Sequence, residues 1–192
     1  MADDDLVQRA KNDRSEFGLL YDRFHPVVTR YCMRRLLDRT VTEDVVADIF
    51  LTLAAKLRAF SGRTEMDLRC WLFRIASNAV NAHLRQSRRR KELLQAAARL
   101  GQERRDAGAL ESAGEMLDWP VVYRALLELE ERDQTILALR FFAGCSYEEI
   151  AEVVDATPGA VRTALSRTLS RLRERFNPSS SGDEALGKLS KD

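Results

Sequence analysis

Two clusters of basic side chains have the type and spacing that phosphate binding requires. From Arg85 to Lys91 five of seven residues are basic, and from Pro158 to Phe176 five arginines stand against one glutamate. The stretch from Val121 to Asp155 has the opposite balance, with eight acidic and three basic residues. Because the formal net charge is only +1, the uneven distribution is the informative feature, and it indicates two separate phosphate-facing surfaces. The first cluster is also compatible with a solvated helix end that complements its own dipole.

The second cluster lies within a pattern typical of a helix-turn-helix. Ser146 and Glu149 have the spacing of a capping box, which predicts the start of a short helix. Residues 155–157 are predicted to form a tight turn, in which Thr157 caps the next helix and Pro158 occupies its first position. The second helix of such a motif enters the major groove of DNA.

The predicted second helix separates into an apolar and a polar face. The apolar face comprises Val161, Leu165, Leu169, Leu172 and Phe176. The outer face comprises Arg162, Thr163, Ser166, Arg167 and Ser170. Arginine can bind guanine through two hydrogen bonds, and hydroxyl groups reach phosphates or bases. A solvated amphipathic helix is the alternative for this segment alone, but the capping box, turn and Thr-Pro start together favour DNA binding.

A mid-helix amide, Asn78, is a second candidate for base recognition. Asparagine is a poor helix former and needs a reason to stand there. An exposed amide can read the edge of an unstacked base, and the loop from Ser61 to Asp67 could wall a pocket for that base. The alternative is a core asparagine that ties its helix to a loop, and the residues by themselves favour that alternative.

Three carboxylates, Glu43, Asp44 and Asp48, share one edge of a predicted helix beside Phe50 and Leu51. Acid–base catalysis is not indicated, since the sequence shows no partner base, metal ligands or pocket signature for them. Glu43 and Asp44 lie in the first turn, where acidic side chains stabilise a helix through its dipole. Asp48 lies beyond that turn and is the better candidate for a protein interface.

The elements that position these residues are predicted to be helices throughout, which gives an all-α fold. Apolar residues recur at three- and four-residue steps over residues 17–36, 45–57 and 68–84, and alternating strand patterns are nearly absent. With a short helix near residues 3–10, these segments predict a four-helix domain over residues 1–92. Residues 93–118, which contain three glycines and no aromatic side chain, are predicted to be a flexible linker with transient helix. A second helical domain is expected over residues 119–177, followed by a disordered tail over residues 178–192.

Cysteine and histidine usage indicates no metal site. Cys32, Cys70 and Cys145 are far apart in sequence, as are His25 and His83, so a zinc-ligand spacing is absent. The cysteines are expected to be free thiols in a reducing compartment. The sequence has no apolar run of membrane-spanning length and begins with an acidic segment unlike a signal peptide, so a cytoplasmic protein without membrane insertion is expected.

Three motifs occur in an order that resembles one protein family. Residues 42–50 (TEDVVADIF) are similar to a polymerase-binding helix, residues 71–78 (WLFRIASN) to a promoter-melting helix, and residues 146–151 (SYEEIA) with 159–162 (GAVR) to an upstream-element reader. Together they closely resemble the extracytoplasmic-function group of bacterial sigma-70-type sigma factors.

The resemblance implies a four-helix sigma-2 domain and a helix-turn-helix sigma-4 domain, with these roles for individual residues. Core polymerase binding would involve Glu43, Asp44, Asp48, Phe50 and Leu51. Binding of the −10 element would involve Ser61, Arg63, Arg74, Asn78, Asn81, Arg85, Arg88 and Arg89. Binding of the −35 element would involve Ser146, Pro158, Arg162, Thr163, Ser166, Arg167 and Arg171.

The resemblance also implies a non-enzymatic specificity subunit without a cofactor. Its partners would be core RNA polymerase and promoter DNA, which is duplex at −35 and melted at −10, with an anti-sigma factor as a further candidate. Three positions depart from the family pattern: Glu130 replaces a common proline, Ala47 a common glutamine and Ala82 a common aspartate. A stand-alone helix-turn-helix regulator, with an N-terminal bundle that dimerises or senses a ligand, is the competing hypothesis.

Overall fold

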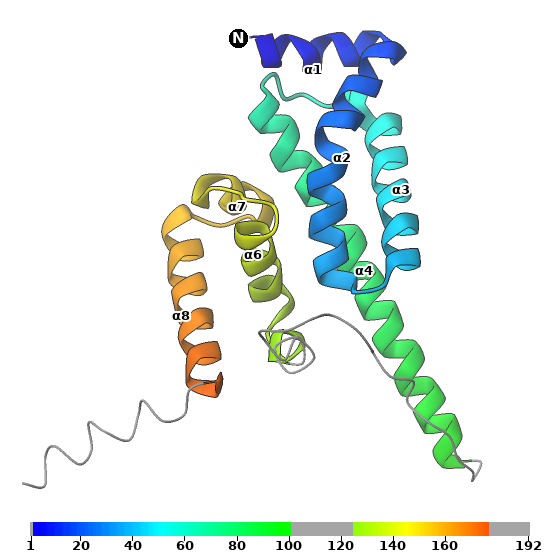
Figure 1. Ribbon diagram of the computed structural model, residues 1–192, viewed down its shortest axis with the longest axis vertical. Helices are drawn as coiled ribbons and strands as arrows, with labels where there is room; N and C mark the ends of the chain where they lie inside the picture. The colour runs from blue at the N-terminus through cyan, green and yellow to red at the C-terminus, as the bar shows by residue number, and fades with distance from the viewer. Residues whose placement is uncertain (1, 101–124, 177–192) are drawn as a thin grey trace, which may run out of the picture.

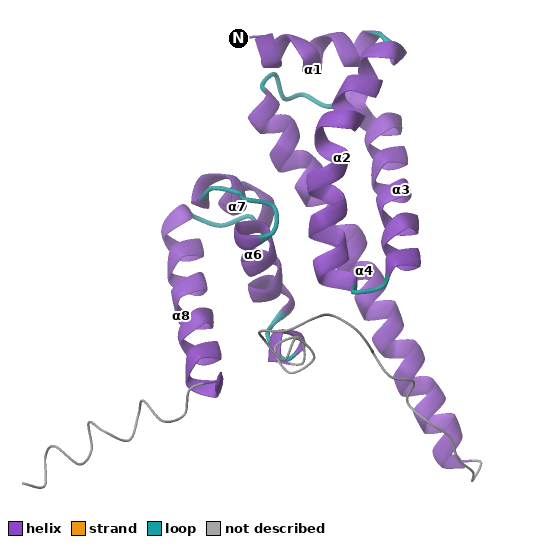
Figure 2. Ribbon diagram, in the orientation of Figure 1, coloured by secondary structure: helices purple, strands orange, loops and turns teal. Residues whose placement is uncertain are grey.

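The computed structural model describes residues 2–100 and 125–176, and in these ranges the regular structure is entirely helical (Figures 1 and 2). The all-α prediction is therefore confirmed. Most of the expected linker and all of the expected C-terminal tail lie outside the described residues. The helices are α1 (Ala2–Asn12), α2 (Arg14–Leu36), α3 (Arg39–Lys56), the short 3-10 helix η1 (Leu57–Ala59), α4 (Glu65–Leu100), α6 (Glu131–Phe141), α7 (Tyr147–Val154) and α8 (Pro158–Phe176).

Helices α1 to α4 form an N-terminal bundle whose short connections are closed by aspartate caps. Asp13 accepts a hydrogen bond from the Ser15 amide at 2.8 Å, and Asp38 accepts one from the Val41 amide at 2.9 Å. Each carboxylate satisfies an amide that the first turn of its helix leaves unpaired. Leu37, with φ of 53°, adopts a left-handed conformation and turns the chain sharply between α2 and α3.

The buried faces of α2, α3 and α4 match the apolar periodicity of the sequence. Their largest fully buried side chains are Leu20, Phe24, Tyr31, Ile49, Leu53, Leu68, Leu72 and Phe73. The Tyr31 and Phe73 rings meet edge to face, with centroids 5.7 Å apart. This core fixes α4 against the other helices of the bundle and so determines which of its side chains face outward.

Helix α4 is longer than the sequence predicted. It continues to Leu100, through the expected domain boundary at residue 92 and into the expected linker. Residues 92–100 read ELLQAAARL and consist of good helix formers, so nothing in this stretch ends the helix before Gly101.

Helices α6, α7 and α8 form a second compact group with the predicted helix-turn-helix. The capping box is present in both directions, since the Glu149 amide donates to Ser146 Oγ at 3.1 Å and the Ser146 amide donates to Glu149 Oε2 at 2.7 Å. Thr157 caps α8 by accepting from the Ala160 amide at 3.2 Å. Val161 and Leu165 are buried as expected, but Phe176, at the last turn of α8, is 41% exposed and does not continue the apolar face.

The two groups of helices lie against each other in this structure. Their buried apolar residues form one continuous cluster, and α4 packs on α7 while α2 contacts α6 (Figure 1). The sequence predicted two domains but gave no relative orientation for them. That orientation determines the surroundings of several candidate site residues.

Candidate nucleic-acid interface

The outward face of α4 carries the polar and basic residues that the sequence singled out. Arg74 and Asn78 are exposed, as are Arg85, Arg88 and Arg89 further along the helix. The buried polar residue in this stretch is Ser77, which the sequence had not selected. Asn78 is therefore not a core asparagine, and its amide is available to a ligand.

A hollow of about 580 Å³ lies at the N-terminal end of α4, beside the loop expected to wall a pocket. Its lining includes Phe60, Ser61, Trp71 and Arg74. The Phe60 and Trp71 rings stack at 4.6 Å, so Trp71 is a half-buried wall of the hollow as well as a packing residue. Among the described residues Asn78 is not part of this lining, although it lies one helical turn beyond Arg74.

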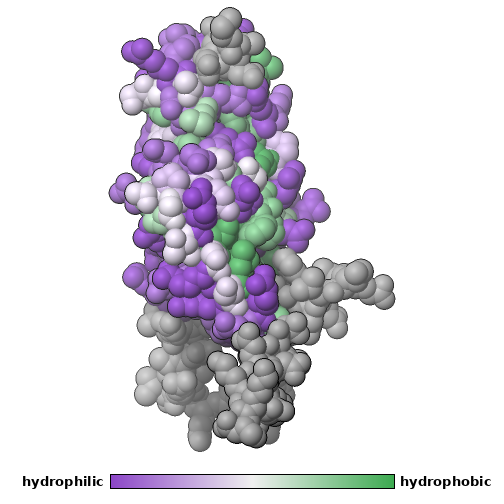
Figure 3. Space-filling model, turned by 90° about the vertical axis from the view of Figure 1, so that its left-hand side faces the viewer, coloured by the Kyte–Doolittle hydropathy of each residue, from purple (hydrophilic) through white to green (hydrophobic). Residues whose placement is uncertain are grey.

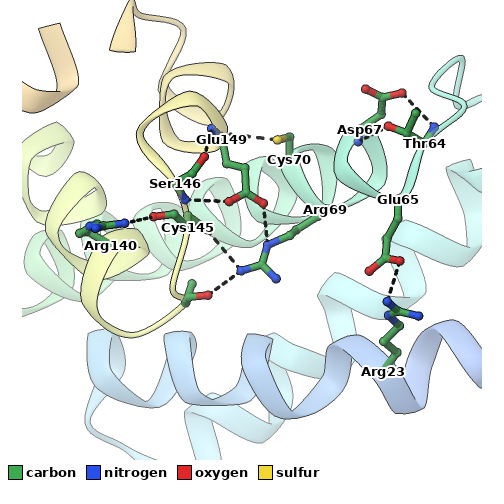
Figure 4. A network of polar contacts seen from close by, with 11 residues as sticks. Arg23, Thr64, Glu65, Asp67, Arg69, Cys70, Arg140, Cys145, Ser146 and Glu149 are labelled. Atoms are coloured by element: carbon green, nitrogen blue, oxygen red, sulfur yellow. Dashed lines mark hydrogen bonds and ion pairs between the residues drawn. The ribbon is translucent and has the colours of Figure 1, made fainter. Parts of the chain in front are cut away.

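The loop beside the hollow is held in place by its own hydrogen bonds. Asp67 Oδ2 accepts from the Arg63 amide at 3.0 Å. It also accepts from the Thr64 amide at 3.0 Å, while the Asp67 amide donates to Thr64 Oγ1 (Figure 4). Hydrogen bonds from the Thr64 and Arg63 amides, and from the Thr64 side chain, lower the pKa of Asp67. Ser61 and Arg63 are exposed on this ordered loop.

Gly62 is required in this loop because the backbone passes close to other atoms. A Cβ atom at this position would lie 2.2 Å from Phe60 Cζ and 2.7 Å from Asp67 Cβ. Lys11 of α1 donates to the Gly62 carbonyl at 2.9 Å and so ties the loop to the first helix. The loop is thus fixed from both sides.

The α3 residues predicted to bind a protein partner divide into exposed and buried positions. Glu43, Asp44 and Asp48 are exposed, and Leu51 is 67% exposed. Phe50 is only 4% exposed, so its ring is not available to a partner as the sequence had suggested.

Two rings of α2 account for the burial of Phe50. The ring centroids of Tyr21 and His25 lie 4.7 Å and 5.9 Å from that of Phe50, and the two α2 rings stack on each other at 4.7 Å. Tyr21 is 38% exposed, so this surface presents the Tyr21 ring, which packs against Phe50, rather than the Phe50 ring itself. Tyr21 was not among the residues predicted for this surface, although the four-residue spacing of Tyr21 and His25 places both rings on one face of α2.

The outer face of α8 is exposed as predicted. Arg162, Thr163, Ser166, Arg167 and Arg171 are all exposed. The Arg162 and Arg140 guanidinium carbons each lie 4.9 Å from the centroid of the Tyr147 ring, which restrains the direction of Arg162. Viewed from the side on which α8 lies, the molecular surface is mainly hydrophilic with a narrow hydrophobic strip (Figure 3).

Two other residues predicted for this surface have structural tasks. The Ser146 hydroxyl oxygen is occupied by the α7 cap, and Pro158 is half-buried at the start of α8. Thr163 Oγ1 donates back to the Gly159 carbonyl at 3.0 Å, but as a hydroxyl it retains acceptor capacity for a ligand. The exposed arginines and Ser166 are therefore the groups most free to contact DNA.

The three cysteines are free thiols, as the sequence predicted. Burial raises the pKa of Cys32 to about 12 and those of Cys70 and Cys145 to about 11, so all three are protonated near neutral pH. Within the described residues, no group of three or more His, Cys, Asp or Glu side chains is arranged to hold a metal ion. None of the described helices is both long and apolar enough to cross a membrane.

Comparison with known families assigns both parts of the chain. Residues 20–90 match the model for sigma-70 region 2, and residues 121–172 match the model for sigma-70, region 4. The chain is 30% identical to the ECF RNA polymerase sigma-E factor of Haemophilus influenzae over 188 residues, which cover 93% of this chain and 97% of that protein. It is 32% identical over 177 residues to the ECF RNA polymerase sigma factor BldN of Streptomyces coelicolor, and that match covers 88% of this chain but only 64% of BldN.

Solved structures share the fold at lower identity. CnrH in complex with the cytosolic domain of CnrY is similar with a TM-score of 0.66 and 23% identity, covering 94% of this chain and 100% of CnrH. RpoE from Bartonella quintana, in complex with the anti-sigma factor NepR, is similar with a TM-score of 0.61 and 22% identity, covering 85% of this chain and 98% of RpoE.

Proposed function

The chain belongs to the extracytoplasmic-function group of sigma-70-type sigma factors, and on this basis we propose which of its surfaces performs each step of promoter use. As a member of this group it is a specificity subunit of RNA polymerase that directs promoter recognition and transcription initiation. The assignment of each step to a surface rests on the exposure, charge and surroundings of the described residues.

The outward face of α4 and the adjoining loop are proposed to bind the melted −10 element. The observation that carries this assignment is the exposed amide of Asn78 in a helix whose basic residues continue on the same side to Arg89. The aromatic-walled hollow beside Ser61 and Arg63 offers a place for an unstacked base, because flipped bases are held by stacking and by hydrogen bonds to their edges.

The exposed face of α8 is proposed to bind the −35 element as duplex. A recognition helix places its first turns in the major groove, and Arg162, Thr163, Ser166 and Arg167 occupy those turns. The capping box fixes α7, and the buried contacts of Val161 and Leu165 hold α8 in its orientation. The arginines can therefore reach base edges or phosphates from a rigid support.

The exposed surface of α3 is proposed to bind core polymerase. Asp48 and Leu51 provide charge and apolar area, and Tyr21 of α2, which packs against Phe50, adds an aromatic ring to the surface. Such a combination suits a helix-on-helix interface, in which buried apolar area supplies affinity and charge sets register. Glu43 and Asp44 extend the acidic edge of the same surface.

We further propose residues 1–92 and 119–177 as the two functional domains, with residues 93–118 as their connection. A protein that works with core polymerase on promoter DNA acts in the cytoplasm, and an anti-sigma factor is a candidate regulator. It would act by covering one of the surfaces assigned above.

Transcription with purified components tests the function. Core polymerase from the host is combined with the full chain and fragmented host DNA, and the 5′ ends of the transcripts are sequenced. We expect transcripts that begin downstream of a shared pair of sequence elements and that depend on added protein. A chain that does not co-elute with core polymerase, and that instead forms a dimer, would contradict the proposal and support a stand-alone regulator.

A further inference from the structure

Lys11, in the last turn of α1, contacts the residues on both sides of Ser61, one of the side chains proposed to meet the −10 element. Its Nζ donates to the Gly62 carbonyl at 2.9 Å and lies 5.2 Å from the centroid of the Phe60 ring. Figure 1 shows α1 across the end of the bundle, beside the connection that leads into α4. One side chain of α1 therefore holds the loop immediately before and immediately after Ser61.

Helix α1 gives this contact a fixed support. Leu6, Val7 and Ala10 are 9%, 0% and 7% exposed, and all three belong to the apolar core of the bundle. Because Lys11 directly follows Ala10, the core contacts of α1 also fix the point from which the lysine side chain extends. The loop cannot move away from Lys11 and carry α1 with it, since that would pull packed side chains out of the core.

The Phe60 ring extends this restraint to the hollow beside the loop. Phe60 and Trp71 stack with their ring planes 11° apart and their centroids separated by 4.6 Å. Both rings line the hollow of about 580 Å³ that also includes Ser61. An ammonium group over the face of an aromatic ring is attracted by the ring's quadrupole, so Lys11 favours this placement of Phe60. Lys11, Phe60 and Trp71 thus form a connected series from α1 to the hollow.

A separate anchor holds the next part of the loop. Asp67 of α4 accepts hydrogen bonds from the amides of residues 63 and 64, whereas Lys11 of α1 holds residues 60 and 62. The contact with α1 therefore sets where residues 60–62 stand relative to Asn78 and the rest of α4. Recognition sites need supporting contacts of this kind, because their groups must be held to within about 0.5 Å.

We propose that Lys11 is a positioning residue for recognition of the −10 element. It holds residues 60–62 so that Ser61 and the Phe60–Trp71 wall meet an unstacked base in one arrangement. This inference rests on the proposed −10 role of the loop. Lys11 acts through the loop and makes no contact with DNA itself. Without it the loop samples several arrangements, and a wrong base is rejected less strongly because the polar groups of the site are no longer fixed against it.

Transcription by core polymerase with the full chain measures this role, on a promoter identified by 5′-end sequencing. Each −10 position is occupied in turn by every base, and the discrimination ratio is the yield with the preferred base divided by the mean yield with the others. Lys11→Met keeps the length of the side chain and removes its ammonium. We expect it to lower the ratio at the most strictly read position about fivefold, since one charge-assisted hydrogen bond is lost from the loop.

A conservative variant and a charge-matched control accompany this test. Lys11→Arg should keep the ratio within about twofold of the wild type, because a guanidinium can donate to the Gly62 carbonyl and lie over the Phe60 ring. Arg58 and Lys11 line one surface hollow of about 380 Å³, so Arg58→Met removes the same charge from the same place without removing the contact with Gly62. It should leave the ratio unchanged. Binding of −35 duplex should be unchanged in every variant.

Fluorescence of Trp71 reports the position of the loop in the absence of DNA. The chain contains 2 tryptophans, so Trp119→Phe leaves Trp71 as the single fluorophore of this kind. In that background Lys11→Met should raise the acrylamide quenching constant about twofold, because Phe60 covers the Trp71 ring for less of the time. Lys11→Arg and Arg58→Met should leave quenching as it is.

The proposal is overturned if Lys11→Met leaves the discrimination ratio unchanged or lowers the yield from every −10 sequence by the same factor. A uniform loss with a weaker salt dependence would instead identify Lys11 as a phosphate contact. Lys11→Ala, which places the strongest helix former in α1, is a second loss variant and should reproduce the effect of Lys11→Met with an unchanged circular dichroism spectrum. A wild type that binds core polymerase but reads no −10 position would count against the proposed role of the loop, whereas the quenching result would still show whether Lys11 fixes it.

Discussion

The hydroxyl oxygens of Tyr31 and Ser77 lie 2.9 Å apart in the interior of the N-terminal bundle, where they join α2 to α4. Tyr31 is 0% and Ser77 5% exposed, so water does not compete for this hydrogen bond. Since successive residues of a helix are rotated by about 100°, fixing Ser77 inward turns Asn78 toward solvent. The Tyr31–Ser77 hydrogen bond therefore orients the Asn78 amide, which is proposed to contact the melted strand.

Asn78→Ala should reduce open-complex formation and leave the fold and core polymerase binding intact. The side chain is exposed, so its removal opens no cavity in the core. Permanganate reactivity of promoter thymines reports melting, and circular dichroism reports the fold. Loss of helical signal in this variant would show that Asn78 has a structural role instead.

Tyr31→Phe should destabilise the protein by about 1–3 kcal/mol, because it leaves the buried Ser77 hydroxyl without this partner. Urea unfolding followed by circular dichroism measures the change. Tyr21→Phe on the same helix is the control, since Tyr21 is 38% exposed and its hydroxyl can be solvated; it should cost little. Equal destabilisation by the two variants would contradict this account of the bond.

Arg162→Ala and Arg167→Ala should each weaken binding to a duplex that carries the −35 element, by about 1–3 kcal/mol where the lost contact is bidentate to a base. Fluorescence polarisation with the full chain measures the affinity. Arg175→Ala, on the same helix but paired with Glu128, is the control and should have a smaller effect. Unchanged affinity in both test variants would remove α8 from the proposed contact.

The combination of Asp48→Arg with Leu51→Ala should abolish co-elution with core polymerase, because it reverses the charge and removes the most exposed apolar side chain of the α3 surface. Binding of −35 duplex should be unchanged. Glu174→Arg introduces an equal charge reversal on α8 and should retain core binding. If the double variant still binds core polymerase as well as the wild type, another surface makes this contact.

Asp67→Asn should destabilise the protein at pH 7 but progressively less toward pH 3. The hydrogen bonds from Thr64 and Arg63 lower the pKa of Asp67 below its ordinary value of 3.8. For a carboxyl whose pKa is lowered by folding, the stabilisation is present above the ordinary value and is lost as pH falls through the lowered one. Thermal unfolding of both proteins across this range provides the test, and a difference independent of pH would argue against a charged cap.

The sequence by itself determined the features that depend on neighbours within about one helical turn. The apolar stripes predicted the helices of the bundle, Ser146 with Glu149 predicted the start of α7, and Thr157 with Pro158 predicted the start of α8. These interactions are local, so residue types at a fixed spacing are enough to specify them. The exposed arginines of α8 followed from the same periodicity.

Only the tertiary structure decided what each outward face meets. The burial of Phe50 depends on two rings of α2, and the partners of Arg74 and Arg85 lie 78 and 46 positions away in the chain. A basic helix face has the same sequence pattern whether water, a phosphate or another helix of the chain lies against it. The choice depends on shape and charge matching between segments far apart in sequence, which local spacing does not encode.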